Sequence, residues 1–560
     1  MLHTSFAISS LLLFSATSAA QDAPFSACPL LGPRFPILPS TATSSIIQQG
    51  LQNLTTAFDD YMLTGTGDFG LITPNTTSFS IALFSTETSN SSNPFLYEYH
   101  HTALTLKNSS KGVKAVDANS VYRTGDLTTL FTIWLFLIEA GEQYWEDPVS
   151  KWVPELASNT SLVTSISQVQ WDKVTLGDLA ANLGGIGRFS PTSDAQDSNL
   201  ASLLEQLGSS NASSPCTTPI FSNAGSIILA YALESIRGQP FPKLFNDSIV
   251  NPLNMSNTSF LEPASSDYGV IPSTRLNSGW TDPLAIEAAF NGIYSSLADI
   301  SIAFRAILSS QLLDEAVTQR WLKPVSLTSN QVNSIGRPWE IYSLTLGGPS
   351  PVIPIYQVRG NIGLYSSHVG LVPDYGVGFV ILGADSESNP DMNAYADLIS
   401  VAMIPALEKN AIVQASTAFS GTYTSVNSSD NTTTASLTIA QATDSTSGIS
   451  LTNLTSGGTD IRAIYAKLND IEPPNLSFRL YPTDLVSETD DTTRMAFRAI
   501  FQDVTELGDA GTPTCDTWRS VDALQLNGVG MDEFVFDMIN GEVVGVEVPA
   551  LGLKLGKEES

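Results

Sequence analysis

Residues 122–132 read Tyr-Arg-Thr-Gly-Asp-Leu-Thr-Thr-Leu-Phe-Thr and decide the fold, because they lead into an apolar run over residues 127–140. Apolar side chains occupy every turn of this run, so we predict a helix that is buried on all sides. The run is shorter than the roughly 20 apolar residues that cross a bilayer, which favours a core helix. Asp126 comes directly before the run, where the free N–H groups and dipole of a helix amino terminus favour a carboxylate.

Patterns on both sides of this stretch predict a mixed α and β domain. Apolar residues at spacings of three and four predict an earlier helix on Ile47, Leu51, Leu54, Phe58 and Tyr61. Alternating apolar residues over 79–83, a polar turn and a second run over 95–101 predict a hairpin. Helical patterns then dominate up to about residue 407, with strand-like runs at 366–371 and 377–382.

The carboxy-terminal part of the chain has a different character. Beyond about residue 411, short Thr/Ser/Val-rich runs are broken by Asn, Gly and Asp. The last two runs, 534–538 and 543–548, flank Asn540-Gly541, a pair suited to a type I′ hairpin turn. We therefore expect a first domain over residues 21–410 and an all-β domain over residues 411–560.

Several short stretches follow residues 122–132 in a fixed order, and they carry a family resemblance. They are Val174-Thr-Leu-Gly-Asp-Leu179, Phe221-Ser-Asn223, Pro252-Leu-Asn-Met255, Gly292-Ile-Tyr-Ser-Ser296 and Gly360-Asn-Ile-Gly363. Together they resemble the serine β-lactamase and penicillin-binding-protein superfamily, in particular its class C and D-alanyl-D-alanine-carboxypeptidase branch and the secreted fungal β-lactamase-like proteins. The resemblance implies an α/β (α+β) fold with an antiparallel sheet flanked by helices, followed by the carboxy-terminal β domain.

The chemistry that the resemblance implies needs a nucleophilic Ser and a Lys in a Ser-x-x-Lys motif at a helix start. It also needs a Tyr from Tyr-x-Asn, a Lys or His on a strand, and backbone N–H groups that form an oxyanion hole. This sequence departs from that pattern at several places. Asp126 stands at the Ser position, Thr129 at the Lys position and Phe221 at the Tyr position, whereas Asn223 is kept.

The strand and loop motifs are also changed. The strand Lys or His falls on Val358 or Asn361, depending on the register, with Gly360 or Gly363 as the motif glycine. The loop motif His-x-Ser-Gly reads Asn182-Leu-Gly-Gly185. None of the eleven Lys follows a Ser at the required spacing, so the chain contains no Ser-x-x-Lys.

We take Asp126, Thr129, Phe221, Asn223, Gly360 and Asn361 as pocket candidates and leave the catalytic residues unassigned. Asp126 has two interpretations, an N-cap that stabilises its helix by about 1 kcal/mol or a general acid/base in a surviving pocket. Phe221 suits a hydrophobic ligand or a closed core equally well. Asn223 has an amide that needs partners, either in a polar pocket or between neighbouring loops.

The histidines give weaker evidence for a functional site than these pocket candidates. His368 stands beside Ser366 and Ser367, but adjacent strand residues point to opposite faces, which argues against a Ser–His pair. His100-His101 follow a strand, and an exposed or capped pair is the simpler interpretation. With four His and three Cys in the chain, we expect no zinc site and no cofactor.

Composition limits the partners. The 560 residues contain 25 Lys plus Arg against 55 Asp plus Glu, a formal charge of −30. Nucleic acids and anionic membrane surfaces attract clustered positive charge, so we expect no nucleic acid and no membrane as partners. The composition does not exclude a small-molecule ligand.

The amino terminus predicts export. Residues 1–20 contain a short apolar run and end in Ser18-Ala19-Ala20, which is typical of a secretory signal peptide. Thirteen N-glycosylation sequons agree with a secreted, extracellular glycoprotein; they start at Asn53, Asn75, Asn90, Asn108, Asn159, Asn211, Asn246, Asn254, Asn257, Asn427, Asn431, Asn453 and Asn475. Cys28, Cys216 and Cys515 allow at most one internal disulfide, and the sequence does not choose the pair.

Three functions follow from these observations. The first is a secreted β-lactamase-like pseudoenzyme that lacks ordinary serine hydrolase activity and whose pocket binds a small molecule or nothing. The second is a repurposed tailoring enzyme of fungal metabolite biosynthesis that uses Asp126. The third is a hydrolase of amide or ester bonds, which would need an unusual mechanism without the Ser and Lys.

Overall fold

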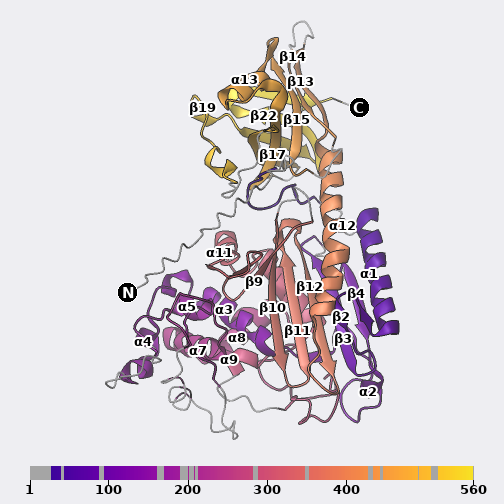
Figure 1. Cartoon of the computed structure of the whole chain (residues 1–560), viewed down its shortest axis with the longest axis vertical. Coiled ribbons are helices and arrows are strands. Elements are labelled where there is room, and N and C mark those ends of the chain that lie inside the picture. Colours follow the sequence, from indigo (N-terminus) through magenta and orange to yellow (C-terminus); the bar gives the residue numbers. More distant parts are fainter. Residues whose placement is uncertain are drawn as a thin grey trace, which may run out of the picture. The chain divides into compact units, whose positions relative to one another are not determined.

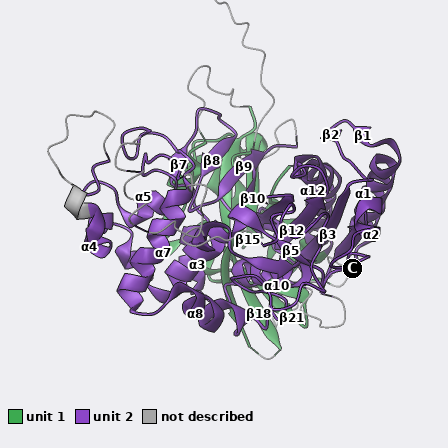
Figure 2. Ribbon diagram, turned by 90° about the horizontal axis from the view of Figure 1, so that it is seen from below, with its two compact units in different colours: residues 1–30, 347–351, 418–560 green, residues 31–346, 352–417 purple. Residues whose placement is uncertain are grey.

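The computed structural model describes residues 27–38, 43–87, 94–159, 169–189, 200, 203, 207, 212–281, 288–346, 352–426, 433–441, 446–489, 491–505 and 515–558. The expected signal segment 1–20 lies outside these residues. The chain forms two compact units, one of residues 31–346 with 352–417 and one of residues 1–30, 347–351 and 418–560 (Figure 2). The boundary expected at residue 410 falls inside helix α12 (Asn393–Phe419), and the units divide seven residues later, after Thr417.

The larger unit is built on an eight-stranded antiparallel sheet in the order β4-β3-β12-β11-β10-β9-β8-β7. The strands are β3 (Thr77–Ser85), β4 (Tyr97–His101), β7 (Ser326–Leu327), β8 (Asn333–Ile335), β9 (Glu340–Leu344), β10 (Ile353–Ile362), β11 (Tyr365–Val372) and β12 (Val377–Asp385). Every residue of β3, β11 and β12 is buried, because helices cover both faces of the sheet. The expected hairpin corresponds to β3 and β4.

Helices α1 (Ser45–Thr64) and α12 cover one face and lie side by side in Figure 1. The buried stripe of α1 contains the predicted residues, from Ile47 to Tyr61. These side chains pack against Ile81 and Phe379 of the sheet and against α12. The prediction of this helix is therefore confirmed.

A layer of helices covers the other face. It contains α3 (Thr128–Glu139), α4 (Val149–Trp152), α5 (Leu176–Ala180), α7 (Asn223–Arg237), α8 (Phe241–Phe245), α9 (Ala288–Asn291), α10 (Leu297–Leu308) and α11 (Glu315–Trp321). Helix α3 is buried at every position from Thr128 to Leu137, as its apolar sequence predicts. This unit also contains β1 (Thr66–Gly67), β2 (Gly70–Leu71), α2 (Leu104–Lys107), β5 (Val121–Arg123) and β6 (Tyr294–Ser296).

The smaller unit is the expected β domain. Its strands are β13 (Gly421–Val426), β14 (Thr433–Ile439), β15 (Ile449–Ser456), β16 (Thr459–Asp460), β17 (Leu476–Glu488), β18 (Thr492–Asp503), β19 (Gln525–Leu526), β20 (Val529–Gly530), β21 (Glu533–Ile539), β22 (Glu542–Val548) and β23 (Leu553–Lys557). Nine of them form one sheet, which an additional β14–β15 pairing closes on itself. One short helix, α13 (Ile461–Leu468), packs on this sheet.

The smaller unit contains the predicted hairpin turn and the disulfide. Asn540 and Gly541 both have positive φ, at 50° and 82°, as a type I′ turn between β21 and β22 requires. The disulfide joins Cys28 to Cys515, and Cys216 is free and exposed. Cys28 is also held by Thr517, whose hydroxyl donates a hydrogen bond to the Cys28 carbonyl at 2.8 Å.

Candidate functional site

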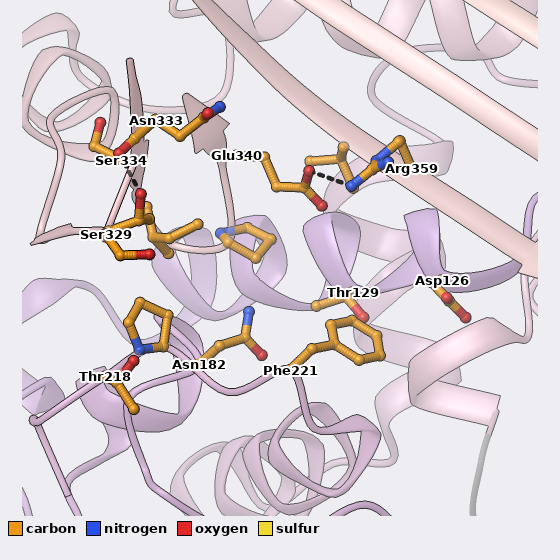
Figure 3. Close-up of a pocket in the computed structure, with 15 residues that line it drawn as sticks. Asp126, Thr129, Asn182, Thr218, Phe221, Ser329, Asn333, Ser334, Glu340 and Arg359 are labelled. Atoms are coloured by element: carbon orange, nitrogen blue, oxygen red, sulfur yellow. Dashed lines mark hydrogen bonds and ion pairs between the residues drawn. The ribbon is translucent and has the colours of Figure 1, made fainter. Parts of the chain in front are cut away.

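A cavity of about 460 Å³ opens in the larger unit, where the edge of the sheet meets the helical layer (Figure 3). Its lining comes from the start of α3 and the turn before it, the loops after α5 and before α7, the connection that follows β7, and strands β8 to β10 with the connection between β8 and β9. The lining residues are Asp126, Thr129, Asn182, Thr218, Pro219, Phe221, Thr328, Ser329, Asn333, Ser334, Ile335, Pro338, Glu340, Val358 and Arg359. Its volume is in the range of small-molecule sites, about 300–1,000 Å³.

Two glycines bring the start of α3 against strand β10. Gly125 has a φ of 59°, and a Cβ on it would lie 2.6 Å from the backbone of Asn361. A Cβ on Gly360 would lie 2.3 Å from the carbonyl oxygen of Thr124. Only residues without a side chain allow this approach. The close contact places Asp126 and Thr129 at the cavity, together with Val358 of β10.

Asp126 lies in a single turn of 3-10 helix, Gly125–Leu127, that precedes α3. It is not the N-cap residue of either helix, since Thr124 holds that position for the 3-10 turn and Leu127 for α3. The N-cap interpretation of Asp126 is therefore wrong. The carboxylate is partly exposed and lines the cavity.

Thr129 stands one turn further along the chain and is 7% exposed. Its side-chain oxygen accepts a hydrogen bond of 3.2 Å from the hydroxyl of Ser226 in α7. Thr129, which the order of the motifs in the sequence assigns to the Lys position, thus carries a neutral hydroxyl that already has a partner. Figure 3 shows Thr129 and Phe221 close together at the same end of the cavity as Asp126.

Phe221, which the order of the motifs in the sequence assigns to the Tyr position, is 37% exposed. Its ring lies 5.9 Å from the ring of Phe290, and the guanidinium of Arg188 lies 4.8 Å from its centre. Such a cation over an aromatic face is stabilising. The loop residue Asn182, at the first position of the altered His-x-Ser-Gly motif, also lines the cavity and accepts a hydrogen bond of 3.4 Å from the Ser222 backbone.

Asn223 lies away from the cavity. It is 8% exposed, and its amide bonds to the backbone of Phe189, accepting from the N–H at 2.9 Å and donating to the carbonyl at 2.8 Å. These two bonds satisfy both ends of the amide. Asn223 therefore joins the start of α7 to the preceding loop, which is the structural one of its two interpretations.

On strand β10, Val358 and Arg359 line the cavity, but Gly360 and Asn361 do not belong to the lining. Gly360 lies against the Thr124 carbonyl, and the side-chain oxygen of Asn361 accepts a hydrogen bond of 2.7 Å from Ser366. Of the two residues to which the sequence assigns the strand Lys or His, Val358 lines the cavity and Asn361 does not. Arg359 forms a 2.7 Å ion pair with Glu340, and both side chains are 47% exposed.

His368 lies on β11, and burial lowers its pKa to about 3, with the charge of Arg359 adding to the shift. Its Nε2 atom is hydrogen-bonded to the Gln357 side chain at 2.7 Å. The neighbouring Ser367 donates instead to the Thr124 carbonyl, at 2.7 Å. The two side chains thus have separate partners and make no Ser–His pair.

A second arrangement of Ser, His and acid lies at the sheet edge. Ser80 Oγ is 2.9 Å from His100 Nδ1, and Glu98 Oε1 is 2.6 Å from His100 Nε2. Ser80 is fully buried and also bonds to the hydroxyl of Tyr122, at 2.9 Å. Since no substrate atom reaches a fully buried hydroxyl, this network joins β3, β4 and β5 and is not a reaction site.

The sequence does not predict the residues that line the far wall of the cavity, opposite Asp126. This wall is formed by polar and apolar residues of the edge strands β7 to β9 and their connections, namely Thr328, Ser329, Asn333, Ser334, Ile335, Pro338 and Glu340. These strands are two to five residues long and have no alternating pattern that a sequence could reveal. Figure 3 shows Ser329, Asn333 and Ser334 at the end of the cavity opposite Asp126.

Within the described ranges, no three His, Cys, Asp or Glu side chains lie close enough together to hold a metal ion. The helices in this part of the chain are all too short or too polar to cross a membrane.

Two family models match the chain. The model described as "Beta-lactamase" matches residues 98–403, and the model described as "Beta-lactamase-like-like, C-terminal domain" matches residues 411–559. The first covers more than half of the chain and contains every residue of the cavity lining.

Three curated relatives illustrate the range of similarity. The chain is 28% identical to "Beta-lactamase-like protein" of Arthroderma benhamiae, over 97% of each chain. It is 24% identical to "Probable hydrolase clz13" of Cochliobolus lunatus, over 71% of each. It is 23% identical to "D-alanyl-D-alanine-carboxypeptidase/endopeptidase AmpH" of Escherichia coli, over 47% of this chain and 71% of that protein. Among solved structures it is similar to "A class C beta-lactamase", with a TM-score of 0.48 and 16% identity, over 64% of this chain and 97% of that one.

Proposed function

The chain belongs to the beta-lactamase family, and from this premise we propose that it is a secreted member that lacks serine hydrolase activity and binds a small molecule in the family's cavity. The single observation that carries the proposal is the lining at Asp126, Thr129, Phe221 and Val358. An open cavity remains at the family position, but the groups that would react there are replaced.

Acylation of a serine hydrolase needs a nucleophile and a base within hydrogen-bond reach of each other. None of the described residues that line the cavity is Lys, His, Tyr or Cys. Two serines, Ser329 and Ser334, line the far wall, where the neighbouring groups are amides, hydroxyls and the Glu340–Arg359 ion pair. A Ser without a base is a weak nucleophile.

Asp126 is a poor substitute for the nucleophile. The positive end of the dipole of the adjacent helix start stabilises a carboxylate as an anion, and this lowers its nucleophilicity. Replacing Ser by Asp therefore turns the reactive corner into a charged recognition group. The retained volume of about 460 Å³ supports binding of a small molecule.

Secretion is part of the proposal. It is supported by the apolar segment at residues 1–20 and by the Cys28–Cys515 disulfide, since disulfides persist in oxidising compartments. The sequon side chains at Asn53, Asn75, Asn108, Asn246 and Asn254 are exposed, as glycan attachment requires. Expression in a fungal host, followed by mass analysis of the medium before and after glycan removal, tests both points.

The loss of activity is tested with covalent probes. The purified protein is incubated with a fluorescent penicillin and with a fluorophosphonate, beside an active class C β-lactamase as the positive control. We expect labelling of the control and none of this protein. Labelling that competes with unlabelled penicillin would overturn the proposal.

A second candidate function is a tailoring reaction that uses Asp126 as a general acid or base. The observation that favours it is the similarity to a fungal relative named as a probable hydrolase. The test compares Asp126→Asn and Asp126→Ala with the wild type in a metabolite-producing host. A changed product profile in both variants would support this candidate, and an unchanged profile would argue against it.

A further inference from the structure

We propose that the cavity binds a neutral sugar ring, which the polar groups on its far wall and on the facing loops recognise through the sugar hydroxyls. This ligand class rests on the proposed function, in which the cavity binds a small molecule without reacting with it. It is supported by polar side chains of the lining that the fold holds in place while part of their hydrogen-bonding capacity stays unused.

Two amides of the lining offer N–H donors from opposite sides of the cavity. Asn182 lies in the loop after α5 and Asn333 at the start of β8, and Figure 3 shows them facing each other. The side-chain oxygen of Asn182 accepts a hydrogen bond of 3.4 Å from the Ser222 backbone, and that of Asn333 accepts one of 2.6 Å from the Asn330 amide. Neither Nδ2 group donates to another residue within the described ranges. A ligand between these donors must supply oxygen acceptors.

Backbone contacts fix both amides before a ligand binds. Asn182 has a φ of 57°, and its carbonyl oxygen accepts a hydrogen bond of 2.7 Å from the N–H of Ile220. Asn333 pairs with Tyr342 of β9, and its carbonyl oxygen accepts a hydrogen bond of 2.9 Å from the Thr328 hydroxyl. Donors that are positioned in advance reduce the entropy that binding costs.

Three hydroxyls and one carboxylate complete the polar surface. The hydroxyls of Thr218, Ser329 and Ser334 make no hydrogen bond in the part of the chain that the structure describes, and each can both donate and accept. Glu340 adds an acceptor, because Arg359 holds one of its carboxylate oxygens at 2.7 Å while the other makes no hydrogen bond to a described residue. The polar surface thus offers donors and acceptors together.

A sugar matches this combination better than an apolar or an ionic ligand. Each sugar hydroxyl accepts from an amide N–H and donates to a carboxylate at the same time. An apolar ligand would bury the amides and the carboxylate without partners, which is unfavourable. The charges of Glu340 and Arg359 compensate each other, so this wall favours neither an anion nor a cation.

The apolar part of the lining suits the C–H faces of a sugar ring. Ile335 and Pro338 lie between the polar residues of β8 and Glu340 along the chain, and Pro219 follows Thr218 on the facing loop. Burial of the C–H faces against these side chains is favourable in addition to the hydrogen bonds. The cavity of about 460 Å³ is large enough for a sugar ring.

The experiment uses neutral glycosides and the full-length protein. The probes are methyl β-D-glucopyranoside, methyl β-D-galactopyranoside and methyl β-D-mannopyranoside, with 2-(hydroxymethyl)tetrahydropyran as a ring that lacks the ring hydroxyls. Binding is measured by ligand-observed NMR and titration calorimetry at 20 mM and 500 mM NaCl. We expect at least one glycoside to bind at least about fivefold more tightly than the ring without hydroxyls. Its affinity should change by less than about twofold between the two salt concentrations, because neutral contacts are not screened.

Two variants test the residues that carry the proposal. S334A removes a hydroxyl that no described residue uses, and N333D removes the N–H donors while it keeps the oxygen that accepts from Asn330. Each should lower the affinity for the glycoside by about threefold to tenfold. S214A, which removes an exposed hydroxyl outside the lining, is the matched control and should bind like the wild type.

Four results would overturn the inference. They are no binding of any glycoside, equal binding of the ring without hydroxyls, an affinity that falls steeply with salt, and an affinity that S334A and N333D both leave unchanged. None of them changes the loss of serine hydrolase activity, which the covalent probes report separately by mass. Covalent labelling would overturn the proposed function whether or not a glycoside binds.

Discussion

The hydroxyl of Ser226 donates a hydrogen bond to the side-chain oxygen of Thr129 across 3.2 Å. The sequence assigns Thr129 to the position of the family's Lys, and Ser226 comes from α7, which begins at Asn223. Both side chains are buried, at 7% and 4% exposure. Thr129 is thus part of a neutral contact between the two helices α3 and α7.

This contact predicts a specific pattern of stability. T129V leaves the buried Ser226 hydroxyl without this acceptor and should lower the free energy of unfolding by about 1 kcal/mol. S226A should cost less, and the double variant T129V/S226A should recover part of the loss, with a coupling of about 0.5–1.5 kcal/mol. Chemical denaturation of the four proteins measures the cycle. Strictly additive effects would show that the contact does not stabilise the fold.

The disulfide predicts a redox-dependent stability. Cys28 and Cys515 are separated by 487 residues, and their bond restricts the unfolded chain. C28S or C515S should destabilise the unit that contains both residues by about 2–5 kcal/mol. A reducing agent should lower the melting temperature of the wild type and not that of C28S. C216S is the control, because the free Cys216 is exposed, and a loss of stability in C216S would contradict this assignment.

The buried His368 predicts a loss of stability in acid. Its pKa is lowered by burial to about 3, whereas an unfolded His titrates near 6.5. Between these values the unfolded state binds the additional proton, so stability falls as the pH falls from 6.5 toward 3, by at most about 1.4 kcal/mol per pH unit.

The variant H368Q removes this titration and should flatten the pH dependence of the free energy of unfolding between pH 6 and pH 4. The slopes of the free energy of unfolding against pH are compared, so a loss of stability that is the same at every pH does not affect the result. H101Q should flatten the slope less, because the pKa of His101 is lowered by burial of a side chain that stays partly exposed. If H368Q had the same slope as the wild type, this would contradict the claim that burial of His368 causes the loss of stability in acid.

The fold could be predicted from the sequence because its signals are local. The apolar run before Ala140 became the buried helix α3, and Asn540-Gly541 became the turn between β21 and β22. The order of the short motifs carried the family resemblance, and the antiparallel sheet with flanking helices and the β domain that it implied are confirmed. The disulfide could not be predicted, because a contact across 487 residues leaves no local pattern.

The site could be predicted only in part, because side-chain direction depends on tertiary contacts. Asp126, Thr129 and Phe221 line the cavity, whereas Asn223 turns to the backbone of Phe189. Asn361 likewise turns to Ser366. The far wall comes from short edge strands whose sequence has no recognisable motif, so its polar groups could not be predicted from the sequence.

The central claim is that the family's cavity is retained while its reactive side chains are replaced, and reconstruction of those side chains tests it most directly. The measurement is the intact mass of the wild type, D126S and D126S/T129K/F221Y after incubation with a fluorophosphonate. We predict no added mass on the wild type and little on D126S, which has a hydroxyl but no base. The triple variant should gain one adduct at position 126. An adduct on the wild type, or a folded triple variant that stays unmodified, would contradict the account.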